Sequence, residues 1–340
     1  MHNRTVRTET ARELDAYSIV DMPIPVPGPG EVRLRVAACG VGHVDALHAT
    51  GRYQATATVP FVPGVEVAGT VDALGDGVDS VCVGDRVLVL VSVQSGFADF
   101  TIAPAPHLAK LPDAMSFAQA ASIRVNALTA LYALKNRGGA GSNDTVLVFG
   151  AAGGVGSAAV TVANILGARA IAVASTQEKR DFALGLGAAG AVDTDPDDWR
   201  QRMVEACGGT GPDIIFDPVC GLLFEPAFRS ISWGGRHLVI GFVGGEIPRL
   251  KANLPLLKGA ALVGVDIRNF NLREPDKAEV NRNLLRQWIA DGSFPPPPVE
   301  EFPLERFRDA LEHAGSGIGL GKTVLTMDRT TMDAPKYNTT

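Results

Sequence analysis

Short hydrophobic runs dominate the first third of the chain. Four of them are rich in β-forming residues, are separated by clusters of Gly, Pro and Asp, and lie between residues 32 and about 102: VRLRVAAC, VEVAGTV, RVLVLVSV and FADFTIA. This spacing predicts a compact, mostly β module. Ser116 then fits a helix N-cap, and the Ala- and Leu-rich stretch through Lys135 predicts one long helix that ends at Gly138.

The pattern changes at Val146. Four almost purely aliphatic runs now alternate with helical segments: VLVFG, AIAVAS, DIIFD and HLVIGF. This β-α alternation is typical of an α/β fold with a parallel sheet covered on both faces. From about Glu279 the chain returns to helix and short strand, with a loop expected at Pro295 to Pro298 and a polar tail at the end.

Composition narrows the choice of partners. A length of 340 residues suggests about two domains, and 46% hydrophobic with 20% charged residues is typical of a globular protein. The net charge of -6 argues against an electrostatic nucleic-acid or anionic-membrane surface, because such surfaces need excess Lys and Arg. We therefore expect small molecules, or a second copy of the chain, as partners.

The N-terminal segment and the cysteines suggest where the protein works. The first residues, MHNRTVRTETARELD, are charged throughout and contain no apolar signal core, and aliphatic runs such as Val87 to Val91 are far shorter than the ~18 residues that span a bilayer. A cytoplasmic location without membrane contact is the expectation. The four scattered cysteines fit reduced, buried thiols rather than disulfides or a structural zinc site: Cys39, Cys82, Cys207 and Cys220.

The most specific motif is VLVFGAAGGVGSAAV, over residues 146–160. It places a glycine-rich turn directly after a buried strand and directly before an Ala-rich helix, which is the context of a dinucleotide-binding fingerprint. Gly150 and Gly153 fit the tight turn, Gly154 close approach to a pyrophosphate, and Gly156 close packing of helix on strand. The helix start near Val155 would present free N–H groups to the phosphates. The motif predicts binding by Gly150, Ala152, Gly153, Gly154, Val155 and Gly156.

The strand that follows indicates which nicotinamide cofactor is used. NAD enzymes place an Asp or Glu about 20 residues after the glycines, where it binds the ribose hydroxyls. Here AIAVAS is followed by Thr176, and no acid stands at the strand tip. Ser175 and Lys179 can instead bind a 2′-phosphate, which predicts NADPH. The alternative is that Lys179 and Arg180 are merely solvated charges in the first turn of the following helix.

Several spaced motifs resemble the medium-chain dehydrogenase/reductases, in their zinc-free quinone oxidoreductase branch. In chain order they read PVPGPGEV, GVEVAGTV, VGDRV, NALTALYAL, GAAGGVG, FDPVCG, RHLVIGF and LGKTVL. The resemblance implies a Rossmann-type, doubly wound parallel sheet inserted between the two parts of a GroES-like β-rich domain. We place the first part at residues 1–125, the Rossmann domain at 126–266, and the second part with the tail at 267–340.

The same resemblance indicates whether the chain has the residues that bind a catalytic zinc. Zinc alcohol dehydrogenases of this superfamily carry C-G-V-C-H and G-H-E, whose Cys and His bind the catalytic metal. This chain has Gly42 and Val65 at those positions, and neither can coordinate zinc. His43, Asp45 and His48 remain close together in sequence, but a catalytic site needs three well-placed ligands, so we expect them to serve packing or hydrogen bonding.

The resemblance also implies residues around the reacting atoms. Tyr53 matches the Tyr of the family's G-x-Y element and is the candidate substrate orienter or proton donor, with packing against the ring as the alternative. Gly42 stands where many relatives have Asn, which leaves the substrate-side donor open. The remaining candidates would line the cofactor: Asn126 and Thr129 on the nicotinamide side, Phe242 and Val243 at the ribose and nicotinamide wall, and Lys322, for which a surface role is equally compatible. The alternative for Asn126 and Thr129 is that they are polar helix residues buried at a domain interface.

Together these features predict an enzyme that transfers hydride from NADPH to a quinone or an enone. Such acceptors are already electrophilic, so the protein need supply only positioning, a dry pocket and a hydrogen-bond donor. An enoyl-thioester reductase and a non-catalytic NADPH-binding protein are the alternatives. A homodimer, or a tetramer built from such dimers, is expected, because ALVGVDI, late in the Rossmann domain, would be an edge strand that needs covering.

Overall fold

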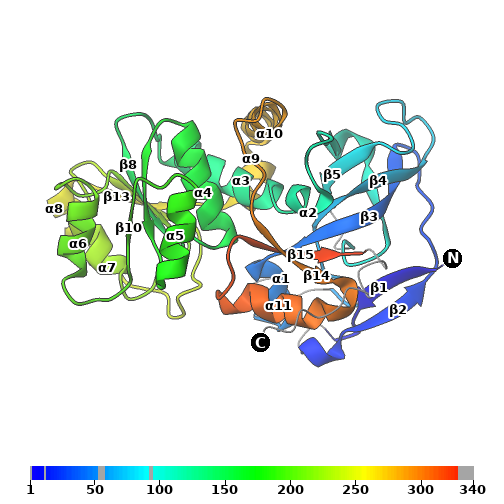
Figure 1. The fold of residues 1–340 in the computed structure, drawn as a ribbon, viewed down its shortest axis with the longest axis horizontal. Coiled ribbons are helices and arrows are strands. Elements are labelled where there is room, and N and C mark those ends of the chain that lie inside the picture. The colour runs from blue at the N-terminus through cyan, green and yellow to red at the C-terminus, as the bar shows by residue number, and fades with distance from the viewer. Residues whose placement is uncertain (1, 11–12, 53–57, 92–94, 328–340) are drawn as a thin grey trace, which may run out of the picture. The chain divides into compact units, whose positions relative to one another are not determined.

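The computed structural model describes residues 2–10, 13–52, 58–91 and 95–327. The chain forms two compact units, and many of their elements are labelled in Figure 1. The β unit comprises Met1–Arg124 and Pro296–Thr340, and the parallel-sheet unit comprises Val125–Pro295. Among the described residues, no helix is both long and apolar enough to cross a membrane.

The β unit is built around one large sheet in the order β14-β15-β3-β4-β5-β7, with β6 also paired to β3. Its strands are β3 (Glu31–Val41), β4 (Glu66–Leu74), β5 (Arg86–Leu90), β6 (Phe100–Pro104), β7 (Ala109–Lys110), β14 (Val299–Pro303) and β15 (Lys322–Thr326). Each of the four β-rich runs expected from the sequence therefore contains a strand. Because β15 pairs antiparallel with β3, with Leu325 opposite Cys39, the two ends of the chain share one sheet and one core. The expected GroES-like unit made from both chain ends is confirmed.

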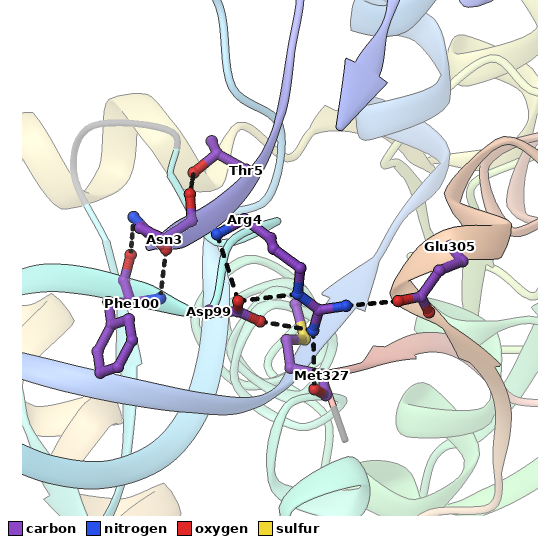
Figure 2. Close-up of polar contacts among 7 residues, drawn as sticks. All are labelled: Asn3, Arg4, Thr5, Asp99, Phe100, Glu305 and Met327. Carbon is purple, nitrogen blue, oxygen red and sulfur yellow. Dashed lines mark hydrogen bonds and ion pairs between the residues drawn. The ribbon is translucent and has the colours of Figure 1, made fainter. Parts of the chain in front are cut away.

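Arg4 ties the N-terminal strands to the C-terminal segment of the same unit (Figure 2). It lies on β1 (Asn3–Arg7), which pairs with β2 (Ser18–Met22). Its guanidinium forms a bidentate ion pair with Asp99, at 2.8 and 2.9 Å, and also contacts Glu305 at 2.5 Å. Planar two-point pairing of this kind fixes geometry as well as charge. Smaller elements complete the unit: η1 (Leu14–Ala16), α1 (His43–Ala49), η2 (Ala105–His107), α2 (Phe117–Ala120), η4 (Leu304–Arg306) and α11 (Phe307–Ser316).

The other unit contains a six-stranded, fully parallel sheet in the order β10-β9-β8-β11-β12-β13. Its strands are β8 (Thr145–Phe149), β9 (Arg169–Val173), β10 (Gly190–Val192), β11 (Ile214–Asp217), β12 (Arg236–Val239) and β13 (Ala261–Gly264). Numbered within the sheet, this is the order 3-2-1-4-5-6 of the Rossmann fold. The expected doubly wound parallel sheet is confirmed.

Helices cover both faces of this sheet (Figure 1). Residues Leu147, Phe149 and Ile171 bury one face against Trp199 and Met203. These two residues belong to α6, which packs with α7, while α4 and α5 run along β8, β9 and β10. The helices are α4 (Gly154–Ile165), α5 (Gln177–Gly185), α6 (Trp199–Ala206), α7 (Phe224–Ser230) and α8 (Asn253–Lys258).

The long helix expected from Ser116 to Gly138 is instead broken. Ser116 is an N-cap as expected, and it forms a capping box with Gln119, but it caps only the short α2. A new helix, α3, runs over Arg124–Leu131 and continues as the π-helical η3, Tyr132–Arg137. Composition could not show this break, because Ala-rich sequence favours helix on both sides of it.

The second domain boundary lies at residue 295/296 rather than at 266/267. The sequence placed it after the last parallel strand, but α9 (Ile267–Arg273) and α10 (Pro275–Ala290) also belong to the parallel-sheet unit. The ring of Phe270 stacks on Tyr132 with centroids 4.0 Å apart, and Asn281 donates to Asn136 at 2.7 Å. These contacts join α9 and α10 to η3, and no local pattern signals them.

Candidate functional site

The glycine-rich turn joins β8 to α4. Gly150 has a φ of +60°, a left-handed backbone that suits glycine, and the N–H of Gly153 closes the turn on the Gly150 carbonyl at 2.9 Å. Gly153 is the N-cap and α4 begins at Gly154. The first N–H groups of a helix have no partner within it and lie at the positive end of its dipole. Residues 150–156 therefore form a turn and a helix start that are suited to bind an anion.

Gly156 is required by packing. A Cβ on this residue would lie 2.1 Å from the carbonyl oxygen of Gly150 and 2.7 Å from its carbonyl carbon, distances that no real side chain tolerates. A Cβ on Gly153 would come no closer than 3.5 Å to the same oxygen. Close contact of helix and turn thus depends on Gly156 and not on Gly153.

Two further loops meet this turn at the carboxyl edge of the sheet. A Cβ on Gly150 would lie 3.4 Å from the Val219 side chain, and one on Gly244 would lie 2.7 Å from the Val219 carbonyl oxygen. The loops that follow β8, β11 and β12 are therefore packed against one another. Strands β8 and β11 are sheet neighbours but not sequence neighbours, and such a switch point is where open α/β sheets bind ligands. Phe242 and Val243, in the loop after β12, are 40% and 51% exposed and so remain accessible.

A buried polar pair fixes the loop after β11. Nε2 of His237 lies 3.0 Å from Oδ2 of Asp217, and Oδ1 of Asp217 accepts from the backbone N–H groups of Val219 and Cys220 at 2.9 and 2.8 Å. Burial raises the pKa of the Cys220 thiol, with the Asp217 charge as the second cause. No sequence motif indicates this pair. Its only signal was a histidine in an otherwise aliphatic strand.

The tip of β9 carries the residues expected to bind a 2′-phosphate. Thr176 caps α5, its hydroxyl accepting from the Lys179 N–H at 3.3 Å, and Ser175 is exposed beside it. Arg180 donates to the carbonyls of Ala174 and Ser175 at 3.1 and 3.3 Å. Arg180 is thus attached to the strand end and is not a merely solvated charge.

A carboxylate that the sequence did not single out lies at the neighbouring strand end. Asp193 follows β10, and its Oδ1 pairs with Nη2 of Arg202 at 2.8 Å. The hydrogen bond from Arg202 lowers the pKa of Asp193, since it stabilises the charged form. The acid typical of NAD enzymes is expected at the tip of β9, so the sequence pattern gives no indication of Asp193.

Asn126 and Thr129 lie together on α3 and are each 8% exposed. The Thr129 hydroxyl donates to the Val125 carbonyl at 2.7 Å, within the same helix. Both side chains belong to the parallel-sheet unit, as does the glycine-rich turn. Their expected role beside the nicotinamide stays a prediction.

Lys322 is 8% exposed, so the alternative of a surface role is wrong. A Cβ on Gly42 would lie 3.1 Å from Nζ of Lys322 and 3.4 Å from Oδ2 of Asp45, and the Gly42 N–H donates to that same Oδ2 at 2.7 Å. Burial raises the pKa of Asp45, and the nearby Lys322 charge opposes that rise. The absence of a side chain at Gly42 therefore leaves room for a lysine and a carboxylate within the β unit.

The residues at the two expected zinc-ligand positions cannot coordinate a metal ion. Gly42 and Val65 supply no donor atom, and across residues 2–10, 13–52, 58–91 and 95–327 no cluster of three His, Cys, Asp or Glu could hold an ion. Glu66, beside Val65, is 1% exposed and accepts from the backbone N–H of Arg124. Tyr53 lies outside the described residues. Of the four cysteines, three are buried as expected and Cys82 is exposed.

A GroES-like β unit and a Rossmann unit with a glycine-rich turn define a two-unit oxidoreductase of the dehydrogenase/reductase class. The sequence matches the alcohol dehydrogenase GroES-like domain over residues 28–113 and the zinc-binding dehydrogenase family over residues 154–283. Quinone oxidoreductase-like protein 2 of Bos taurus is 35% identical over 300 residues, which cover 87% of this chain and 85% of that protein. The chain belongs to the medium-chain dehydrogenase/reductase superfamily, in its quinone oxidoreductase branch.

Solved structures share the fold over nearly the full length. Mycobacterial Rv1454c complexed with NADPH has a TM-score of 0.83 at 30% identity, covering 95% of this chain and 99% of that one. The CurK enoyl reductase has a TM-score of 0.85 at 24% identity, covering 96% and 99%. The second likeness shows the fold alone.

Proposed function

We propose that this protein is an NADPH-dependent oxidoreductase that reduces a quinone or an activated C=C bond of an enone without zinc. The observation that carries the proposal is the anion-binding edge of the parallel sheet. There the free N–H groups at the start of α4 lie at the switch point, and the tip of β9 offers a hydroxyl and a cation but no acid. The NADPH complex of the similar mycobacterial protein supports it.

Different groups of candidate residues would bind different parts of the cofactor. Gly150, Ala152, Gly153, Gly154, Val155 and Gly156 would hold the pyrophosphate through backbone N–H groups. Ser175, Thr176 and Lys179 would bind the 2′-phosphate, with charge-assisted bonds from the lysine. Asn126, Thr129, Phe242 and Val243, all in the parallel-sheet unit, would line the nicotinamide and its ribose. Lys322, in the β unit, is a further cofactor-binding candidate, which rests on the family resemblance. When bound, NADPH supplies a hydride.

Gly42 and Val65 favour an acceptor that needs no metal. With no ligand at either position, the protein cannot polarise an alcohol or ketone through zinc. A quinone or enone takes up hydride with the negative charge developing on its oxygen, so a positioned donor suffices. Tyr53 is our candidate for that donor or orienter.

The test is NADPH consumption against a panel of quinones, enones and enoyl thioesters, with NADH in parallel. Turnover of quinones or enones, with a higher kcat/KM for NADPH than for NADH, is the expected result. Turnover confined to enoyl thioesters would replace the acceptor with that of an enoyl-thioester reductase. Tight NADPH binding without oxidation across the whole panel would show a non-catalytic binding protein instead.

A further inference from the structure

The ends of β9 and β10 lie side by side, and the second end carries a negative charge. Val192 is in register with Val173, and the Ala174 N–H donates to the Val192 carbonyl at 3.1 Å. Asp193 therefore adjoins Ala174 and Ser175. This is the segment on which the proposed function places the 2′-phosphate of the cofactor.

Arg202 of α6 holds the Asp193 carboxylate. Its Nη2 contacts Asp193 Oδ1 at 2.8 Å and also donates to the Asp195 carbonyl at 2.9 Å, while Nη1 donates to the Asp197 carbonyl. The side-chain hydrogen bond between the two raises the pKa of Arg202 and lowers that of Asp193, because it stabilises both charged forms. Because backbone carbonyls fix the guanidinium, it does not depend on Asp193 alone for its position.

We propose that the Asp193–Arg202 ion pair determines which nicotinamide cofactor this protein prefers. Arg202 neutralises a carboxylate that would otherwise repel the 2′-phosphate, so the strand ends accept NADPH. Without Arg202, the Asp193 carboxylate would keep only the hydrogen bond from the Asp195 N–H, at 3.0 Å, and would leave its negative charge uncovered at the strand ends, where an acid can accept hydrogen bonds from the ribose hydroxyls of NADH. The inference rests on the proposed function, because it takes the 2′-phosphate to lie at the tip of β9.

The expected effect is moderate, since each side chain of the pair is 35% exposed and solvent screens its charge. The 2′-phosphate carries between one and two negative charges near neutral pH. Uncovering a unit charge at the neighbouring strand end should weaken NADPH binding by about three- to tenfold at low salt, and less at high salt. NADH, which lacks the phosphate, should bind equally well or more tightly.

The experiment compares dissociation constants for NADPH and NADH by titrating cofactor fluorescence in the wild type and four variants. Arg202→Met uncovers the carboxylate, and Asp193→Asn removes it. The double variant Asp193→Asn with Arg202→Met has neither charge. Arg200→Met is the matched control, because Arg200 lies on the same helix but bonds to Ser230 at 2.9 Å.

We expect Arg202→Met alone to shift the ratio of the two constants toward NADH, and the double variant to return it toward the wild-type value. Arg200→Met should leave the ratio unchanged. Equal weakening of both cofactors in Arg202→Met, or a double variant that stays shifted, would overturn the inference, because a merely structural pair would act in that way. Thermal melts identify any variant that has lost its fold.

The same measurements distinguish a failure of the proposed function from a failure of the role given to the ion pair. Wild-type protein that binds NADH better than NADPH, or binds neither, contradicts the proposed function. Wild-type protein that prefers NADPH, together with an Arg202→Met ratio equal to wild type, contradicts only the role of the ion pair.

Discussion

His237 and Asp217 form a side-chain hydrogen bond of 3.0 Å in the interior of the parallel-sheet unit, where they are 0% and 1% exposed. The rings of Phe224 and Phe228 flank the histidine, with centroid distances of 4.5 and 6.0 Å. Asp217 also orders the loop that packs against the glycine-rich turn. The pair thus connects the buried strand β12 to the loop that packs against the glycine-rich turn of the candidate cofactor site.

Replacement of His237 by Leu should destabilise the protein. The change removes a buried partner of Asp217 and should cost about 2 to 3 kcal/mol in the free energy of unfolding, because a buried acceptor is left unsatisfied. Urea denaturation measures this difference. His107→Leu is the control, since His107 is exposed, and a His237 variant no less stable than that control would contradict the prediction.

Gly156→Ala should be far more damaging than Gly153→Ala. The first methyl group would meet the Gly150 backbone at 2.1 Å, while the second would find its nearest atom at 3.5 Å. Overpacking of this kind costs about 2 to 3 kcal/mol, and displacement of the turn should also weaken NADPH binding. Melting temperature and cofactor titration of the two variants test it. Equal stability would show that α4 can move away from the turn freely.

Lys179→Ala should weaken NADPH binding by about tenfold to a hundredfold, the loss expected for a charge-assisted contact of about 1.5 to 3 kcal/mol. The affinity for NADH should change little, because NADH has no 2′-phosphate. Glu178→Ala, one position away, is the matched control. If Lys179→Ala leaves NADPH affinity unchanged, the 2′-phosphate does not lie at this strand end.

Zinc should be dispensable. Because Gly42 and Val65 occupy the ligand positions, we expect no stoichiometric zinc after purification and full activity in the presence of a chelator. Elemental analysis and assays with and without chelator provide the measurement. About one tightly held zinc per chain, removed together with activity, would refute the proposed hydride acceptor as well.

The protein should form a homodimer through the edge strand β13. This strand ends the parallel sheet, and no other strand of the described residues pairs with its outer edge. Nearby apolar side chains are exposed: Trp233 by 80%, Leu256 by 78%, Leu257 by 67% and Leu262 by 44%. Such an edge is a liability unless a second copy covers it. Light scattering at micromolar concentration should give twice the mass of one chain. Leu262→Arg should yield monomers and Ile318→Arg, in the β unit, should not; a monomeric wild type would contradict the prediction.

Local sequence predicted most of the fold because its signals come from contiguous residues. Aliphatic runs of strand length, the strand–turn–helix order at residues 146–160 and the Ser116 cap each depend on neighbours in the chain. The same holds for Gly150 and Gly156, whose places in the turn follow from spacing alone. The break between α2 and α3 was missed, because helix propensity is high on both sides and packing decides where such a helix ends.

By itself, then, the sequence determined the two kinds of unit, their order and the position of the dinucleotide turn, since hydrophobic periodicity and glycine spacing are properties of short segments. Only the tertiary structure decided which distant side chains meet. The register of β11 with β12 brings His237 to Asp217, and that of β9 with β10 brings Asp193 beside Ser175. Strand β15, from the other end of the chain, pairs with β3, and Lys322 at the start of β15 lies near Gly42. Such contacts depend on sheet register and side-chain direction, which no local pattern specifies.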